Sequence, residues 1–248
     1  MDTIIKTTLA LFIILLAAFS GFLVLTLYPE AAYQNSVAGT YTYTCTITTD
    51  SSLSNVTFFI PVPADPAGNS PMDSAFSSRT MNGVPADWDT ALFDTGKATL
   101  LKVMTPAIIP PEGTSAQHPY MITFSKETTD RTPINTTNPV DQSAMFRPVQ
   151  ALNETTCPPG SADSAGRCFT YTTPLYADYH AVPTAIVTIT ADVKGKNTWT
   201  IFEPRFNEYT SAVGTKIHGE NHGWVFLEGE LTSGTGTYDI FPDTRFFR

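Results

Sequence analysis

The residues best suited to chemistry lie late in the chain, in the run His218-Gly-Glu220-Asn-His222. Two of the four histidines stand close together here, with a carboxylate between them. On a helix, this spacing would place both imidazoles on one face, where they could bind a single metal ion. The neighbouring glycines and asparagine disfavour a helix, and in an extended chain the two histidines would be roughly 13 Å apart. The sequence therefore favours a polar turn, with a metal site as the less favoured alternative.

A second pair of groups that could do chemistry is Glu228 and Glu230, at alternate positions of a segment with strand-like periodicity. On a strand their side chains would share a face about 6.6 Å apart, within the roughly 5–9.5 Å that separates the two carboxyl groups of glycosidases. Trp224 and Phe226 belong to the same face and could stack on carbohydrate without catalysis. A solvated strand face, with Trp224 packed beneath a loop, is the simpler interpretation and the one that we favour.

Other classes of activity leave no signature in the sequence. Serine-nucleophile, phosphate-binding and dinucleotide-binding patterns are absent, so we expect no cofactor. The chain carries 23 acidic and 14 basic side chains, a formal net charge of -9 at pH 7. Such a negative field repels phosphate backbones, so we do not expect nucleic-acid binding.

Residues 9–27 are apolar except for Ser20 and Thr26, and no charge occurs between Lys6 and Glu30. About 20 apolar residues in a helix cross the hydrocarbon core of a bilayer, so we interpret residues 1–30 as a single-pass membrane anchor. A cleaved signal peptide is the alternative, with residues 18–20 as a passable cleavage site, but it would leave an exposed apolar N-terminus. Lys6 favours a cytoplasmic N-terminus and an extracellular remainder, with the opposite orientation as the alternative.

Cysteines and sequons agree with an extracellular location for the rest of the chain. Cys157 and Cys168 bracket a loop rich in turn-forming residues, and a disulfide between them would contribute about 3 kcal/mol in the chain-entropy model. Such a bond persists in an oxidising compartment, whereas Cys45 lies within an apolar alternation and is expected to be a buried free thiol. Asn-X-Ser/Thr sequons, which would be surface positions if glycosylated, occur at Asn55, Asn135 and Asn153.

The elements that must position these groups are strands. Residues 40–48 alternate without a break, residues 185–193 and 198–202 have the pattern of a hairpin, and residues 223–231 alternate again. We therefore predict an all-β fold over residues 39–248, an antiparallel β-sandwich of immunoglobulin-like or jelly-roll-like type. A polar tether, residues 31–38, would join it to the anchor. The polar stretch near 128–167 is expected to be a surface excursion, with a boundary between two β subdomains as the alternative.

The N-terminal anchor, the segment Asn55-Val-Thr-Phe-Phe-Ile-Pro-Val-Pro63 and the later Gly223-Trp224 strand resemble uncharacterised exported proteins of archaea. This resemblance implies a location at the cell surface and brings no catalytic residues with it.

The function expected from these features is that of a membrane-anchored, extracellular structural or binding protein of the cell envelope, without catalysis. Its partners would be the membrane, through residues 9–27, and envelope proteins or carbohydrate. A surface hydrolase is the first alternative, either metal-dependent or glycosidase-like. A filament subunit is the second, although Lys6-Thr7-Thr8 matches the usual basic processing site poorly.

Overall fold

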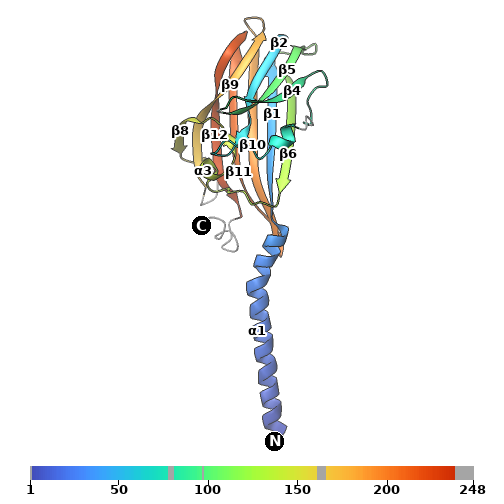
Figure 1. Cartoon of the computed structure of the whole chain (residues 1–248), viewed down its shortest axis with the longest axis vertical. Helices are drawn as coiled ribbons and strands as arrows, with labels where there is room; N and C mark the ends of the chain where they lie inside the picture. Colours follow the sequence, from blue (N-terminus) through green and yellow to red (C-terminus); the bar gives the residue numbers. More distant parts are fainter. Residues whose placement is uncertain (1, 78–80, 97, 161–165, 238–248) are drawn as a thin grey trace.

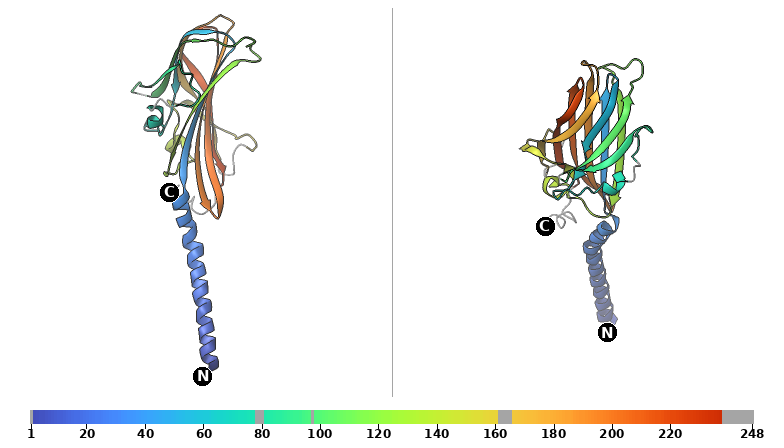
Figure 2. Two further views of the ribbon diagram at one scale, coloured as in Figure 1. Left: turned by 90° about the vertical axis from the view of Figure 1, so that its right-hand side faces the viewer. Right: turned by 45° about the horizontal axis from the view of Figure 1, so that its top comes forward.

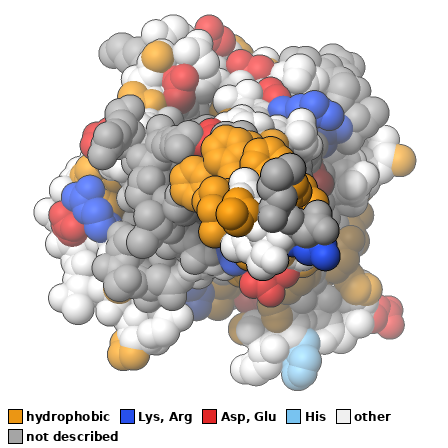
Figure 3. Space-filling model, turned by 90° about the horizontal axis from the view of Figure 1, so that it is seen from below, with side chains coloured by type: hydrophobic (Ala, Val, Ile, Leu, Met, Phe, Trp, Pro, Cys, Tyr) orange, Lys and Arg blue, Asp and Glu red, His pale blue; other side chains and the backbone are white. Residues whose placement is uncertain are grey.

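Helix α1 (Asp2–Ser36) projects from one end of a β-rich body (Figure 1). The computed structural model describes residues 2–77, 81–96, 98–160 and 166–237. Within those residues, α1 is the one helix long and apolar enough to cross a membrane. Its 35 residues extend about 50 Å at 1.5 Å per residue. Seen from its N-terminal end, the helix presents hydrophobic side chains to the surroundings (Figure 3), as a lipid-facing helix requires.

The segment predicted as a polar tether is not a separate linker. Helix α1 continues to Ser36, and strand β1 (Ala38–Thr49) begins after one intervening residue. Tyr33 and Val37 are buried against Trp199 and Ile201 of strand β10 (Ile186–Ile201), and the Ser36 hydroxyl accepts a hydrogen bond from the Thr200 amide at 2.9 Å. Two apolar side chains within a polar stretch therefore dock the end of the helix onto the sheet.

The prediction of an antiparallel all-β fold is confirmed, but the strands are arranged differently from two facing sheets. In the described part of the chain, ten strands form one sheet in the order β4-β5-β2-β9-β12-β11-β10-β1-β6, with β8 also paired to β9. The sheet curls into a half-barrel (Figure 2). The remaining bounds are β2 (Leu53–Pro61), β4 (Asp89–Asp94), β5 (Thr99–Ile108), β6 (Tyr120–Asp130), β8 (Gln150–Thr155), β9 (Cys168–His180), β10 (Ile186–Ile201), β11 (Glu203–His218) and β12 (Asn221–Gly236).

The two faces of the curled sheet differ in burial, because side chains alternate along each strand. We call the buried face the inner face and the solvent-exposed face the outer face. The inner face carries the hydrophobic core and is covered by short inserted elements. These are β3 (Pro63–Ala64) and β7 (Met145–Phe146), which pair with each other, α2 (Asp73–Ser77) and α3 (Pro139–Gln142). Sequence alternation indicates that one face is buried, but it does not identify what buries it.

Much of the predicted surface excursion near 128–167 covers the inner face instead. Ile134, Met145 and Phe146 are buried, and their polar neighbours are hydrogen-bonded within the body. The side-chain amide of Asn197 accepts from the Ile134 amide at 2.8 Å and donates to its carbonyl at 2.7 Å. These bonds explain how a polar, proline-containing segment can be buried, since each buried polar group needs a partner. Strand β8 then rejoins the sheet beside the first half of β9.

The predicted disulfide is confirmed. Cys157 and Cys168 are bonded, with their Cα atoms 5.1 Å apart, and they link the segment after β8 to the start of β9. Cys45 is a buried free thiol on the inner face, as expected. Burial raises the pKa of this thiol, which keeps it protonated and unreactive.

Replacing both Cys157 and Cys168 with serine should lower the free energy of unfolding by about 3 kcal/mol. The reason is that the bond closes a loop with a sequence separation of 11 and so restricts the unfolded chain. Urea unfolding of the full-length protein in lipid nanodiscs measures the change. A reducing agent should destabilise the wild type by the same amount and leave the double variant unaffected; equal effects on both proteins would contradict the prediction.

Candidate functional site

Of the metal and ligand-binding candidates that the sequence suggested, His222, Trp224, Glu228 and Glu230 lie on β12, Glu220 lies in the turn just before it, and His218 ends β11. Strands β9 and β12 are antiparallel, and their register places His222 opposite Asp178, Trp224 opposite Tyr176 and Glu228 opposite Thr172. These even-numbered side chains of β12 share the outer face, where Trp224 is 58% exposed. The candidate residues are therefore spread along the β9–β12 pair on the outer face, from the end far from helix α1 toward the end near it.

At the upper end of this ladder, His180, Glu220 and His222 come together. Each offers a ligand atom, and these atoms all lie within 4.8 Å of one another. Nδ1 of His180 is 3.4 Å from a carboxylate oxygen of Glu220, and Nε2 of His222 is 3.7 Å from the same oxygen. The two imidazole rings have centroids 4.8 Å apart. We call these three residues the His/Glu group.

The His/Glu group differs from the predicted one by a single histidine. His218 ends β11, where it pairs with Ile186 of β10, whereas His222 lies on β12 beside β9. The turn between β11 and β12 separates the two histidines, and Gly219 in this turn has a left-handed conformation at φ 72°. The sequence thus identified Glu220 and His222 but not His180, which comes from a strand about 40 residues earlier.

Asp178 orients one of the histidines. Nδ1 of His222 lies 2.7 Å from a carboxylate oxygen of Asp178. This hydrogen bond, together with the charges of Asp178 and Glu220, raises the pKa of His222. In the neutral ring, donation from Nδ1 to Asp178 leaves Nε2 with its lone pair directed toward the side where Glu220 lies.

Directly below the His/Glu group, four aromatic side chains form a line across the outer face. Phe93, Phe59, Tyr176 and Trp224 come from β4, β2, β9 and β12, and successive ring centroids are 5.1, 5.6 and 5.4 Å apart. We call this line the aromatic row. The prediction that Trp224 packs beneath a loop is wrong, since its indole stands exposed at the end of the row.

The aromatic row lines a shallow depression of about 370 Å³ that also contains polar groups. Thr57, Lys102 and Asp178 contribute a hydroxyl, an ammonium and a carboxylate to its lining. The ammonium of Lys102 lies 5.7 Å from the centroid of Phe59. Phe93 and Trp224 at the two ends of the row are 47% and 58% exposed, and exposed apolar side chains grouped beside polar ones are characteristic of interaction sites.

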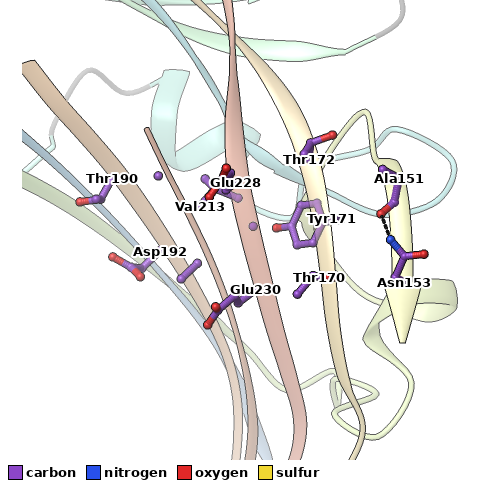
Figure 4. A pocket seen from close by; sticks show the side chains of 13 residues that line it. Ala151, Asn153, Thr170, Tyr171, Thr172, Thr190, Asp192, Val213, Glu228 and Glu230 are labelled. Atoms are coloured by element: carbon purple, nitrogen blue, oxygen red, sulfur yellow. Dashed lines mark hydrogen bonds between the residues drawn. The ribbon is translucent and has the colours of Figure 1, made fainter. Parts of the chain in front are cut away.

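Further down the ladder, Glu228 and Glu230 line an open hollow of about 700 Å³ (Figure 4). The hollow exists because β11 contributes only Ala212 and Gly214 between these glutamates and the Thr190–Asp192 segment of β10. Burial raises the pKa of Asp192. Carboxylates around an open, solvated hollow are what any strand with exposed glutamates presents, so this arrangement alone does not favour a glycosidase.

The three predicted glycosylation positions differ in their surroundings. Asn55 and Asn153 are exposed, on β2 and β8. Asn135 is half-buried, donates a hydrogen bond to Gln142 and accepts others from Thr137 and Asn138. A glycan on Asn135 would replace an amide hydrogen in this network, so Asn55 and Asn153 are the better-placed acceptors.

Comparison with known proteins adds no relative, since no family model, curated protein or solved structure matches this chain. The resemblance to archaeal exported proteins therefore stays a prediction.

Proposed function

We propose that this chain is a membrane-anchored, extracellular carbohydrate-binding protein of the cell envelope. The observation that carries the proposal is the aromatic row, four rings in line on the outer face with Trp224 exposed at one end. The extracellular location is supported by the apolar helix α1, by Lys6 on its N-terminal side and by the Cys157–Cys168 disulfide.

Carbohydrate suits the aromatic row because a pyranose ring has an apolar C–H face and a rim of hydroxyl groups. The C–H face packs on an aromatic ring, and the hydroxyls need hydrogen-bonding groups at the edges. Asp178 and Thr57 lie in the same depression as the rings and can accept and donate such bonds. A row across several strands fits an extended chain of sugar units better than a single small molecule.

The charge of the protein narrows the class of carbohydrate. With a formal net charge of -9, the chain repels anionic polymers over distances of about a Debye length. A neutral glycan is therefore the expected ligand. The hydrolase alternative is less well supported, because the His/Glu group and the glutamates are on open faces that do not exclude water.

The test is binding of neutral oligosaccharides to the full-length protein in lipid nanodiscs, followed by tryptophan fluorescence and calorimetry. A panel of β-linked glucose, β-linked N-acetylglucosamine and mannose hexamers would serve as probes. Removing the Trp224 ring should weaken binding about tenfold or more, since stacking on an aromatic side chain contributes on the order of 1–3 kcal/mol and about 1.4 kcal/mol is tenfold.

Phe206→Ala is the matched control, because Phe206 is a partly exposed ring near the opposite end of the sheet and should leave affinity unchanged. Binding of none of the probes, or equal weakening by Trp224→Ala and Phe206→Ala, would refute the aromatic row as a carbohydrate site.

A further inference from the structure

We propose that His180, Glu220 and His222 form a binding site for a zinc ion, with Asp178 as the residue that positions His222. This inference goes beyond carbohydrate binding and does not depend on it. The site stands on the convergence of one imidazole from β9, one from β12 and the Glu220 carboxylate from the turn before β12, all three exposed.

The distances within the group fit one small cation. Zinc binds imidazole nitrogen and carboxylate oxygen at about 2.0–2.2 Å, so two ligand atoms at a tetrahedral angle are about 3.4 Å apart. The distances from the Glu220 oxygen to His180 Nδ1 and to His222 Nε2 are 3.4 and 3.7 Å. All three ligand atoms lie within 4.8 Å of one another, so the two imidazoles would rotate toward a central ion, which exposed side chains can do.

Asp178 supplies the supporting contact that zinc-binding histidines usually have. A ligating histidine commonly donates its other ring N–H to a carboxylate, which fixes the tautomer and the ring orientation. His222 has this arrangement, with Nδ1 2.7 Å from Asp178 and Nε2 facing Glu220.

The contribution of these side chains to folding stability does not explain why they are clustered. The side chains of His180, Glu220 and His222 are 56%, 58% and 47% exposed, and ion pairs this exposed contribute little to folding. Two nitrogens and one oxygen suit zinc better than calcium or magnesium, which prefer all-oxygen sites. Three protein ligands leave a position open to water or to a ligand from solution.

The test is a titration of Zn²⁺ into the full-length protein in lipid nanodiscs at neutral pH, after chelation and dialysis, followed by calorimetry. We expect one ion per chain. His180→Ala and His222→Ala should each weaken binding at least a hundredfold, and Asp178→Asn should weaken it by about 10–100-fold. Mg²⁺ and Ca²⁺ should not compete.

His218→Ala is the matched control, because His218 is an exposed histidine at the adjacent end of β11 but lies outside the group. It should bind zinc as the wild type does, and Trp224→Ala should too, which separates this site from the aromatic row. No stoichiometric zinc binding by the wild type, or equal losses in His218→Ala and His222→Ala, would overturn the proposal. Thermal unfolding without zinc should be nearly unchanged in all of these variants, because the substituted side chains are exposed.

Discussion

Replacing Phe146 with alanine should lower the free energy of unfolding by about 3–5 kcal/mol. Phe146 is fully buried on β7 and forms an edge-on contact with Tyr43 of β1, with ring centroids 6.3 Å apart. It belongs to the inserted segment that covers the inner face of the half-barrel. Among the described residues, the half-barrel is covered by the two-stranded β3–β7 pair and short helices rather than by a second large sheet, so each large side chain of the cover replaces contacts that a large facing sheet would make. Urea unfolding of the full-length protein in nanodiscs measures the loss.

Phe226→Ala is the matched control for this prediction. Phe226 lies on the same sheet but is 55% exposed on the outer face, so its removal should change stability by no more than about 0.5 kcal/mol. If Phe146→Ala destabilised the protein no more than Phe226→Ala does, the inserted segment would not be part of the core.

Replacing Trp199 with alanine should also cost about 3–5 kcal/mol, and it should free the end of helix α1 from the sheet. Trp199 is buried on β10 and packs edge-on against Tyr33 of the helix, with ring centroids 5.7 Å apart. Loss of this contact removes the main reason for residues 31–37 to stay docked. Hydrogen–deuterium exchange should rise in this segment, and thermal unfolding should shift to lower temperature.

Trp199→Phe separates packing from hydrogen bonding at the same position. The Trp199 Nε1 group is buried with no hydrogen-bond partner among the described residues, and an unsatisfied buried donor costs about 1–3 kcal/mol. Phenylalanine keeps an aromatic ring and removes that donor, so it should retain most of the protection of residues 31–37. Unchanged exchange in Trp199→Ala would show that the helix end is held by something else.

The sequence was sufficient for local structure and insufficient for the partners of each element. The unbroken alternation of residues 40–48 predicted β1, and the short spacing of Cys157 and Cys168 predicted the disulfide; both are properties of contiguous residues. The sequence pointed to two facing sheets because buried and exposed side chains alternate in the same way in a sandwich and in a curled sheet whose inner face is covered by loops. The pattern alone does not distinguish the two architectures. The covering segment was predicted as a surface loop because its composition is polar. Its buried backbone at Ile134 is instead hydrogen-bonded to the side chain of Asn197, which is distant in the sequence.

The candidate site divides in the same way. Glu220, His222 and Trp224 were identified because they lie close together in sequence. His180, Asp178 and Tyr176 were missed because β9 and β12 are neighbours in the sheet although β10 and β11 lie between them in the sequence. The alternation of Tyr176, Asp178 and His180 did contain a signal, a strand whose outward side chains are aromatic, acidic and imidazole. It becomes informative only once the register is known.

The near-direct passage from helix α1 into β1 has a mechanical consequence. One residue, Val37, separates the two elements, and the buried Tyr33–Trp199 contact joins the end of the helix to the sheet, so we expect little rotation at this junction. If α1 tilted in a bilayer, the whole sheet would therefore tilt with it. Strand β12, which carries His222 near the end far from α1, has 16 residues and is about 50 Å long at 3.3 Å per residue. The outer face would therefore lie at a fixed distance from the bilayer and in a fixed orientation to it. Neighbouring copies of the protein would then present their sites in the same orientation.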